Sequence, residues 1–148
     1  MVQQFLPEIQ RSGEWSLVFI GGEYSHSVRK FAAAGDFRVQ TQFGGRVEAA
    51  TPNLLLINTA AKTLSEIGKP PLYARLDGFE RDDTFVLMEL ELIEPVLFLG
   101  LGEAAALFAQ MIALSLENSI AASLRDFYNA RRRSDDKAYF RRIVKGAI

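Results

Sequence analysis

The stretch LYARLDGFERDDTFVLMELELI, residues 72–93, decides the fold of this chain. It contains two largely apolar runs, residues 72–79 and 84–93, joined by the polar segment 80–83. Apolar runs of this length that flank a short polar turn are typical of a β-hairpin. We therefore predict two antiparallel strands here, the second of which is ended by Pro95.

A second hairpin is predicted upstream. Residues 15–20 (WSLVFI) and 23–31 are separated by two glycines, which can adopt the positive φ angles of a tight turn. Residues 37–43 alternate apolar and polar side chains, as in a half-buried strand or an ordered extended loop. Residues 1–6 are expected to form a short strand, and residues 7–13 a loop.

Helical periodicity runs from residue 51 to residue 67. The hydroxyl of Thr51 can cap the first turn, and Pro52 suits a position where its missing N–H costs nothing. Gly68 is expected to end the helix in the left-handed conformation. The predicted core-facing stripe consists of Ile57, Ala60, Ala61, Leu64 and Ile67.

The C-terminal third is also predicted to be helical. Residues 104–117 are small and apolar, whereas residues 118–148 are rich in arginine, with a helix break expected at Ser134. From residue 15 onward, the order is three extended segments, a helix, two strands and two helices. It predicts an α+β fold, with packed helices on an antiparallel sheet and a basic helical tail.

Composition supports a globular protein with an uneven charge distribution. Of 148 residues, 49% are hydrophobic and 24% charged, which argues against disorder. The net charge of −1 hides 14 acidic and 9 basic side chains in residues 1–115, against 4 and 8 in residues 116–148. We therefore divide the chain into a domain, 1–115, and a basic extension, 116–148.

The same composition excludes some classes of site. The absence of cysteine rules out disulfides and thiolate zinc sites. The N-terminus lacks a secretory leader pattern, and no uncharged apolar run reaches about 18 residues. A cytoplasmic location is therefore expected.

Carboxylates on the second strand of the 72–93 hairpin suggest a metal site. Strict alternation puts five side chains on one face: Phe85, Leu87, Glu89, Glu91 and Ile93. Two glutamates about 7 Å apart repel each other unless a cation joins them. The partner strand offers Asp77 and Arg75 at alternate positions, so three carboxylates and a guanidinium converge if the register aligns them.

Two interpretations of these carboxylates remain open. Oxygen ligands without histidine or cysteine suit magnesium or manganese. Alternatively, Glu89 or Glu91 pairs with Arg75, Arg29 or Arg38 in a purely structural ion-pair network, which residue spacing alone cannot distinguish from a metal site.

Three motifs in order resemble the ATP-grasp superfamily. RLD followed by LMELELIEP resembles the metal-binding hairpin of its C-terminal part. VQQFLPEI before GEW resembles the nucleotide hinge of the glutathione synthetase-like branch. SVRK followed by AGDFRVQTQFGG resembles the arginine and flexible loop of the branch that includes ribosomal-protein glutamate ligases. The likeness covers roughly residues 1–113 and extends to ligases of the cycloserine-biosynthesis type.

The resemblance implies site residues one by one. Magnesium ligands would be Asp77, Glu89 and Glu91. The adenine slot and the ribose contact would come from Gln3, Gln4, Phe5, Leu6 and Glu14. Arg29 would face phosphate as a catalytic residue, and Arg38 would lie beside the substrate.

The resemblance also implies an activity, namely ATP- and magnesium-dependent joining of a carboxylate and an amine through an acyl phosphate, with manganese as a substitute metal. Whole members of the superfamily are longer and carry a further lysine-bearing subdomain. We therefore expect this chain to be a portion with little turnover alone, which a homodimer or a split-enzyme partner would complete. The alternative is a non-catalytic module that binds a protein or polyanion through its basic helix, although nucleic acid and membranes are not favoured as partners.

Overall fold

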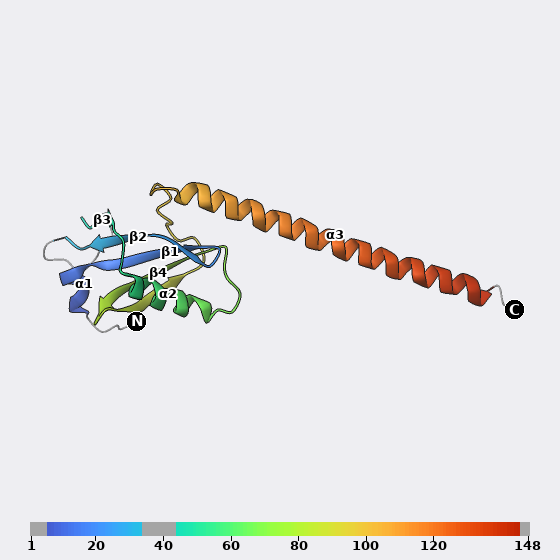
Figure 1. The fold of residues 1–148 in the computed structure, drawn as a ribbon, viewed down its shortest axis with the longest axis horizontal. Helices are drawn as coiled ribbons and strands as arrows, with labels where there is room; N and C mark the ends of the chain where they lie inside the picture. Colours follow the sequence, from blue (N-terminus) through green and yellow to red (C-terminus); the bar gives the residue numbers. More distant parts are fainter. Residues whose placement is uncertain (1–5, 34–43, 146–148) are drawn as a thin grey trace. The chain divides into compact units, whose positions relative to one another are not determined.

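The computed structural model describes residues 6–33 and 44–145, with side chains described up to Asn129. The chain divides into two compact units, Met1–Met111 and Ile112–Ile148. The predicted α+β class is confirmed (Figure 1). In chain order the described elements are α1 (Pro7–Ser12), β1 (Glu14–Ile20), β2 (Glu23–Phe31), β3 (Arg46–Ala49), α2 (Leu54–Ser65), β4 (Tyr73–Arg81), β5 (Thr84–Glu91) and α3 (Ala104–Lys145).

The described strands form one antiparallel sheet in the order β3-β2-β1-β4-β5. The predicted hairpin of β1 and β2 is present, with Gly21 and Gly22 both at positive φ in its turn. Its register shifts once, because Val18 pairs with His26 whereas Phe19 pairs with Tyr24. The residue between these partners, Ser25, has no counterpart on β1 and forms a β-bulge.

The β4–β5 hairpin is also present, but its turn is tighter than predicted. Only Asp82 and Asp83 form the turn, both with positive φ, because Arg81 already pairs with Thr84. A second bulge lies opposite the Asp77/Gly78 step of β4, where the register shifts.

This bulge corrects the predicted faces of β5. Phe85 lies in the core with Leu76, whereas Glu89 lies opposite Asp77 on the other face of the sheet. The prediction that Phe85 and Leu87 share a face with both glutamates is therefore wrong, since strict alternation makes no allowance for an extra residue.

Helix α2 covers one face of the sheet (Figure 1) and packs its buried side chains against the core residues of the strands. Its buried residues Leu56, Ala60 and Leu64 pack with side chains of β1 and β4. The helix begins at Leu54 rather than near Thr51, because the Asn53 side chain accepts a hydrogen bond from the Leu56 N–H at 2.8 Å. Ile67 lies beyond its end and is 42% exposed.

The segment between β5 and the first turns of α3 covers part of the opposite face. The Leu97 carbonyl lies 2.7 Å from Nε2 of His26. The ring of Phe108 packs edge-on against Tyr73, with centroids 5.8 Å apart. Polar side chains on this face are thereby enclosed at one end of the sheet.

Other predictions need correction or lie outside the described residues. Residues 7–12 form helix α1 instead of a loop, because Pro7 suits the first helical position. Strand β3 was not predicted. The expected break at Ser134 is absent, since α3 continues to Lys145 with neither glycine nor proline in it. The extended segments predicted at 1–6 and 37–43 fall almost wholly outside the described residues.

Candidate functional site

The three carboxylates predicted as magnesium ligands converge on one face of the sheet. One ligand oxygen from each of Asp77, Glu89 and Glu91 lies within 4.8 Å of the others. The register explains this, because Asp77 pairs with Glu89 and Arg75 pairs with Glu91 across the two strands. Asp77 is only 3% exposed, Glu91 is half-buried and Glu89 is exposed, so the cluster opens to solvent on the β5 side.

Asp77 is the most heavily bonded carboxylate of the cluster. The Ser16 hydroxyl donates to its Oδ1 at 2.5 Å, and Arg75 donates to both of its oxygens, with Nη2 at 2.8 Å from Oδ2. Burial works to raise the pKa of Asp77, but these hydrogen bonds and the positive charge of Lys30 outweigh burial and lower it. Asp77 is therefore held ionised, as a metal ligand must be.

Arg75 joins two of the carboxylates directly. Its Nη2 also donates to Oε1 of Glu91 at 2.6 Å, and its Nη1 donates to the Val96 carbonyl at 3.3 Å. Burial works to lower the pKa of Arg75, yet the hydrogen bond to Asp77 and the nearby acidic charges raise it overall. Both interpretations of the sequence thus find support, because a carboxylate cluster and an ion-pair network occupy the same place.

Lys30 is a functional candidate that the sequence analysis did not assign to this site. Its Nζ lies 2.8 Å from Oε1 of Glu14 and 3.2 Å from Oδ2 of Asp77. Glu14 and Lys30 are paired residues of β1 and β2, and each side chain is 12% exposed. Burial raises the pKa of Glu14, and Lys30 only partly offsets this effect. The strand register was the signal that could have identified Lys30.

Arg29 is not brought to the carboxylate cluster. It pairs with Trp15, so it points to the α2 side of the sheet, where its guanidinium carbon lies 4.7 Å from the centroid of the Trp15 ring. Its Nε is buried and has no hydrogen-bond partner among the described residues. Alternation along β2 therefore separates Arg29 from Lys30 by the thickness of the sheet.

The remaining predicted residues are placed only in part. Leu6 precedes the first turn of α1, where its backbone carbonyl accepts a hydrogen bond from the Ile9 N–H at 3.2 Å. The other predicted nucleotide and substrate contacts lie outside the described residues: Gln3, Gln4, Phe5 and Arg38.

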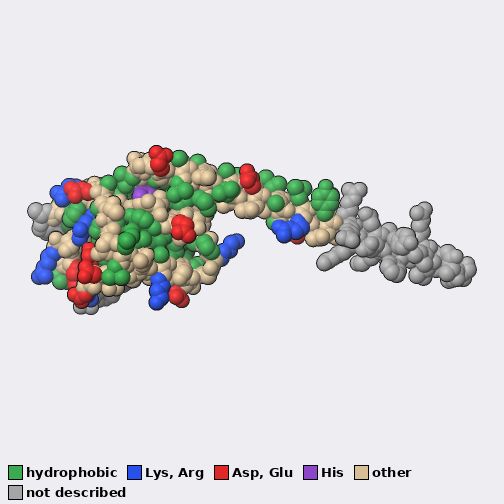
Figure 2. Space-filling model, in the orientation of Figure 1, with side chains coloured by type: hydrophobic (Ala, Val, Ile, Leu, Met, Phe, Trp, Pro, Cys, Tyr) green, Lys and Arg blue, Asp and Glu red, His purple; other side chains and the backbone are tan. Residues whose placement is uncertain are grey.

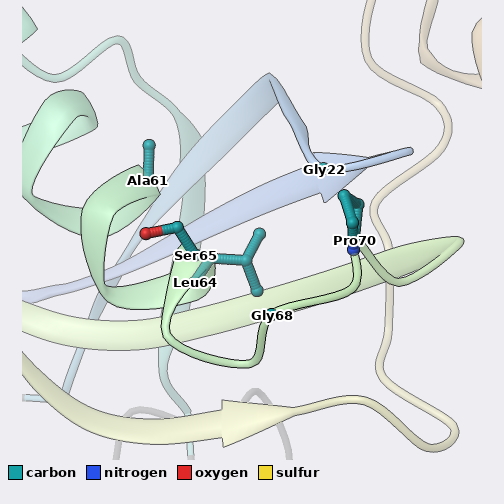
Figure 3. Close-up of a pocket in the computed structure, with 6 residues that line it drawn as sticks. All are labelled: Gly22, Ala61, Leu64, Ser65, Gly68 and Pro70. Atoms are coloured by element: carbon teal, nitrogen blue, oxygen red, sulfur yellow. The ribbon is translucent and has the colours of Figure 1, made fainter.

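Two cavities are lined by described residues elsewhere in the first unit. One, of about 110 Å³, lies beside the end of α2, where Pro70 approaches Gly22 (Figure 3). Its lining has no charged side chain, and the Ser65 hydroxyl already donates to the Lys62 carbonyl. The other, of about 480 Å³, is lined by Tyr24, His26, Leu101, Glu103 and small residues. Neither offers a cluster of ligands like that around Asp77.

The donor set around Asp77 can hold a hard cation. Three carboxylate oxygens close together suit magnesium or manganese, which keep waters or phosphate oxygens as their other ligands. Lys30 and Arg75 add two fixed positive charges beside the same carboxylates. Together these groups form a surface on which a metal-bound polyphosphate would find both metal ligands and cationic partners.

Comparisons with known proteins identify the fold. No protein-family model matches the sequence, and no curated protein matches it significantly. D-cycloserine synthetase DcsG superposes with a TM-score of 0.65 and 28% identity, over 77% of this chain and 41% of that one. D-alanine–D-alanine ligase from Bacillus anthracis, solved with ATP, gives 0.50 and 18%, over 75% and 39%. The ATP-grasp ligase PsnB, complexed with a minimal precursor, gives 0.50 and 19%, over 69% and 35%.

All three matches cover the same part of the solved proteins. In each case this chain spans about two fifths or less of the solved protein, and the part covered is C-terminal. All three proteins are ATP-grasp ligases, which confirms the resemblance inferred from the hairpin and hinge motifs. The chain has the fold of the C-terminal part of the ATP-grasp ligases.

Proposed function

We propose that residues 1–115 bind a magnesium–ATP complex and form part of a ligase that joins a carboxylate to an amine. The single observation that carries this proposal is the convergence of Asp77, Glu89 and Glu91 within 4.8 Å. The fold shared with ATP-grasp ligases, one of them solved with ATP, supports the choice of nucleotide. Manganese is the expected substitute, since it accepts the same oxygen ligands.

The carboxylates would hold the metal, and the metal would neutralise the phosphate oxygens and orient them for transfer. The proposed reaction has two steps. A substrate carboxylate oxygen attacks the terminal phosphorus of ATP, which forms an acyl phosphate and releases ADP. An amine then attacks the acyl carbon, the amide bond forms, and inorganic phosphate leaves with the electron pair of the broken C–O bond.

Two positively charged side chains on the same face of the sheet could stabilise the negative charge of the phosphate groups in this reaction. Lys30 and Arg75 are both held by Asp77, so their charges are in place before a phosphate arrives. We propose that Lys30, rather than Arg29, contacts phosphate among the described residues of β2. Glu14, which pairs with Lys30, would meet the ribose.

Turnover should need more than this chain supplies. The described groups that could hold phosphate all lie on one face of one sheet, so they would cover the nucleotide from one side only. Phosphoryl transfer depends on enclosing and aligning the reacting groups. We therefore expect nucleotide binding with little or no ligase activity from the 148 residues alone, and completion of the site by a second copy or another chain.

The test is binding of magnesium–ADP, measured by calorimetry and by the shift of the unfolding temperature. The wild-type chain should be stabilised by ADP with magnesium or manganese, and not by ADP with a chelator. Asp77→Asn and Glu89→Gln should abolish this stabilisation.

A matched control removes an equal charge elsewhere. Glu23 is exposed at the start of β2, so Glu23→Gln should bind magnesium–ADP like the wild type. Equal nucleotide binding in all four proteins, or no binding in any, would refute the proposed function.

A further inference from the structure

Helix α3 carries an apolar stripe that has no cover within its own unit. Ile112, Leu116, Ile120 and Leu124 follow at intervals of four residues, and Phe127 adds to the same side of the helix. Their exposed fractions range from 37% for Ile112 to 60% for Ile120. The second unit, Ile112–Ile148, has this one helix as its described structure, so no other element of that unit can bury the stripe.

The side of the helix opposite the stripe is more polar, although Leu114 also lies there and is 44% exposed. The side opposite the stripe carries Ser115, Asn118, Ala122, Arg125 and Asn129. Figure 2 shows hydrophobic side chains gathered along the described part of α3. The segment thus has the alternating faces of a helix that lies at a boundary between an apolar and an aqueous phase.

A strongly basic segment follows directly. Residues 130–145 contain seven lysines or arginines and two aspartates, and α3 continues through all of them. Two exposed aromatic residues, Phe127 and Tyr128, stand at the C-terminal end of the apolar stripe, just before the basic segment. Aromatic side chains are favoured at the level of lipid headgroups, and clustered basic residues are attracted to anionic lipids.

Contrary to the expectation from the sequence, we propose that α3 binds the surface of an anionic lipid bilayer, with the stripe from Ile112 to Phe127 in the headgroup region and the basic segment on the phospholipid charges. An anionic membrane is the partner that engages both halves of the helix. RNA would leave the aliphatic side chains of the stripe unused. Pairing with a second copy would bring together two helices that each carry an excess of positive charge.

The helix lies on the membrane and does not cross it. By length and composition alone, Ala104–Asn129 could span a bilayer. Its first turns belong to the other unit, however, where Phe108 packs on Tyr73 and Met111 lies against Gly21. The remaining residues of this stretch, 112–129, include Glu117 near their centre. Placing a carboxylate in the hydrocarbon core of a bilayer costs free energy.

The experiment is flotation of the full-length chain with vesicles of phosphatidylcholine, with and without phosphatidylserine, at low and high salt. We expect binding to the anionic vesicles at low salt, weakened by high salt. Ile120→Glu should reduce the partition coefficient at least about tenfold, because it puts a charge in the apolar stripe. Replacement of Arg131, Arg132 and Arg133 by glutamine should reduce it by about tenfold or more.

Ala122→Glu is the matched control, because it adds the same charge on the opposite side of the helix and should retain most of the binding. Circular dichroism checks that each variant keeps its helix. Absence of binding by the wild type, equal binding to neutral vesicles, or equal losses in Ile120→Glu and Ala122→Glu would each overturn the proposal. The proposal would also be overturned if the wild-type chain bound no vesicles but formed a dimer that Ile120→Glu dissociates. The stripe would then pair with a second copy of the chain.

Discussion

The ammonium group of Lys30 lies 3.2 Å from the carboxylate of Asp77, although β1 separates the two strands that carry them. The pair reaches across the small Ser16 side chain, whose hydroxyl also donates to Asp77. Asp77 therefore gathers a lysine, an arginine and a serine from three different strands. This convergence makes the cluster sensitive to single substitutions in ways that can be measured.

Lys30 and Arg29 should differ in their effect on nucleotide binding. Under the proposed function, Lys30→Met should weaken magnesium–ADP binding about tenfold or more, the value of one charge-assisted hydrogen bond. Arg29→Met removes the same charge on the α2 side of the sheet and should leave the affinity nearly unchanged. Calorimetric titration of both variants provides the measurement, and a larger loss in Arg29→Met would contradict this placement.

Lowering the pH should reveal how much the ionised Asp77 carboxylate contributes to the free energy of unfolding. Because its pKa is lowered by folding, the unfolded chain binds this proton more readily, so stability rises with pH across the range between the two pKa values. The contribution is present above the unfolded-state pKa and is lost as pH falls through the folded-state pKa. Denaturant unfolding at several pH values should give a flatter acid limb for Asp77→Asn than for the wild type.

Glu14 should affect the pH dependence of stability in the direction opposite to that of Asp77, so the two residues can be compared within one protein. Its pKa is raised by folding, so its favourable contribution is present at low pH and is lost as pH rises through the folded-state pKa. Glu14→Gln should therefore make the stability of the protein rise more steeply with pH in the acid range. An unchanged slope in both variants would show that neither carboxyl has the shifted pKa described above.

Arg75 should compete with a divalent cation for the same carboxylates. Arg75→Met leaves Asp77 and Glu91 without their shared guanidinium, so the metal-free variant should lose about 3 kcal/mol or more of unfolding free energy. Magnesium should then raise the unfolding temperature of the variant more than that of the wild type, because the ion replaces the missing charge. The measurement is thermal unfolding with and without magnesium, with calcium as an ion of equal charge and larger radius.

Gly78 should tolerate no side chain. A Cβ atom there would collide with the Val86 carbonyl oxygen and the Phe85 ring. Gly78→Ala should cost about 1–3 kcal/mol of stability and disturb the bulge that turns Glu89 toward Asp77. Gly100→Ala is the control, since a Cβ atom at Gly100 meets nothing within 4 Å. Equal unfolding temperatures for the two variants would contradict this account.

The elements that the sequence predicted well are those with strong local signals. The Gly21-Gly22 turn and the long apolar strands of β4 and β5 specify their hairpins by turn chemistry and composition. Helix α2 was predicted from its 3.6-residue periodicity, but its first residue was misplaced because Asn53 competes with Thr51 as a cap. The carboxylate cluster followed from alternation once the register of the hairpin was known.

The failures have physical causes that a single strand or helix does not reveal. The bulge in the β4–β5 pair depends on packing between strands, so Phe85 was placed on the wrong face. The predicted break at Ser134 relied on two aspartates as start signals, which do not interrupt a helix that lacks glycine and proline. Lys30 was overlooked because the face of the sheet to which a side chain points is reversed by each bulged residue between it and the turn.

The bulged Ser25 determines which cation faces Asp77. If Ser25 were instead taken into regular pairing, the two-residue turn at Gly21-Gly22 would pair Glu14 with Arg29, and Lys30 would point toward α2. The bulge itself therefore matters more here than the chemistry of the residue at position 25. In a library of variants, a single-codon deletion at Ser25 would remove the bulge and still leave Lys30 opposite Glu14, because His26 would then follow Tyr24 directly in the register that the two strands already have.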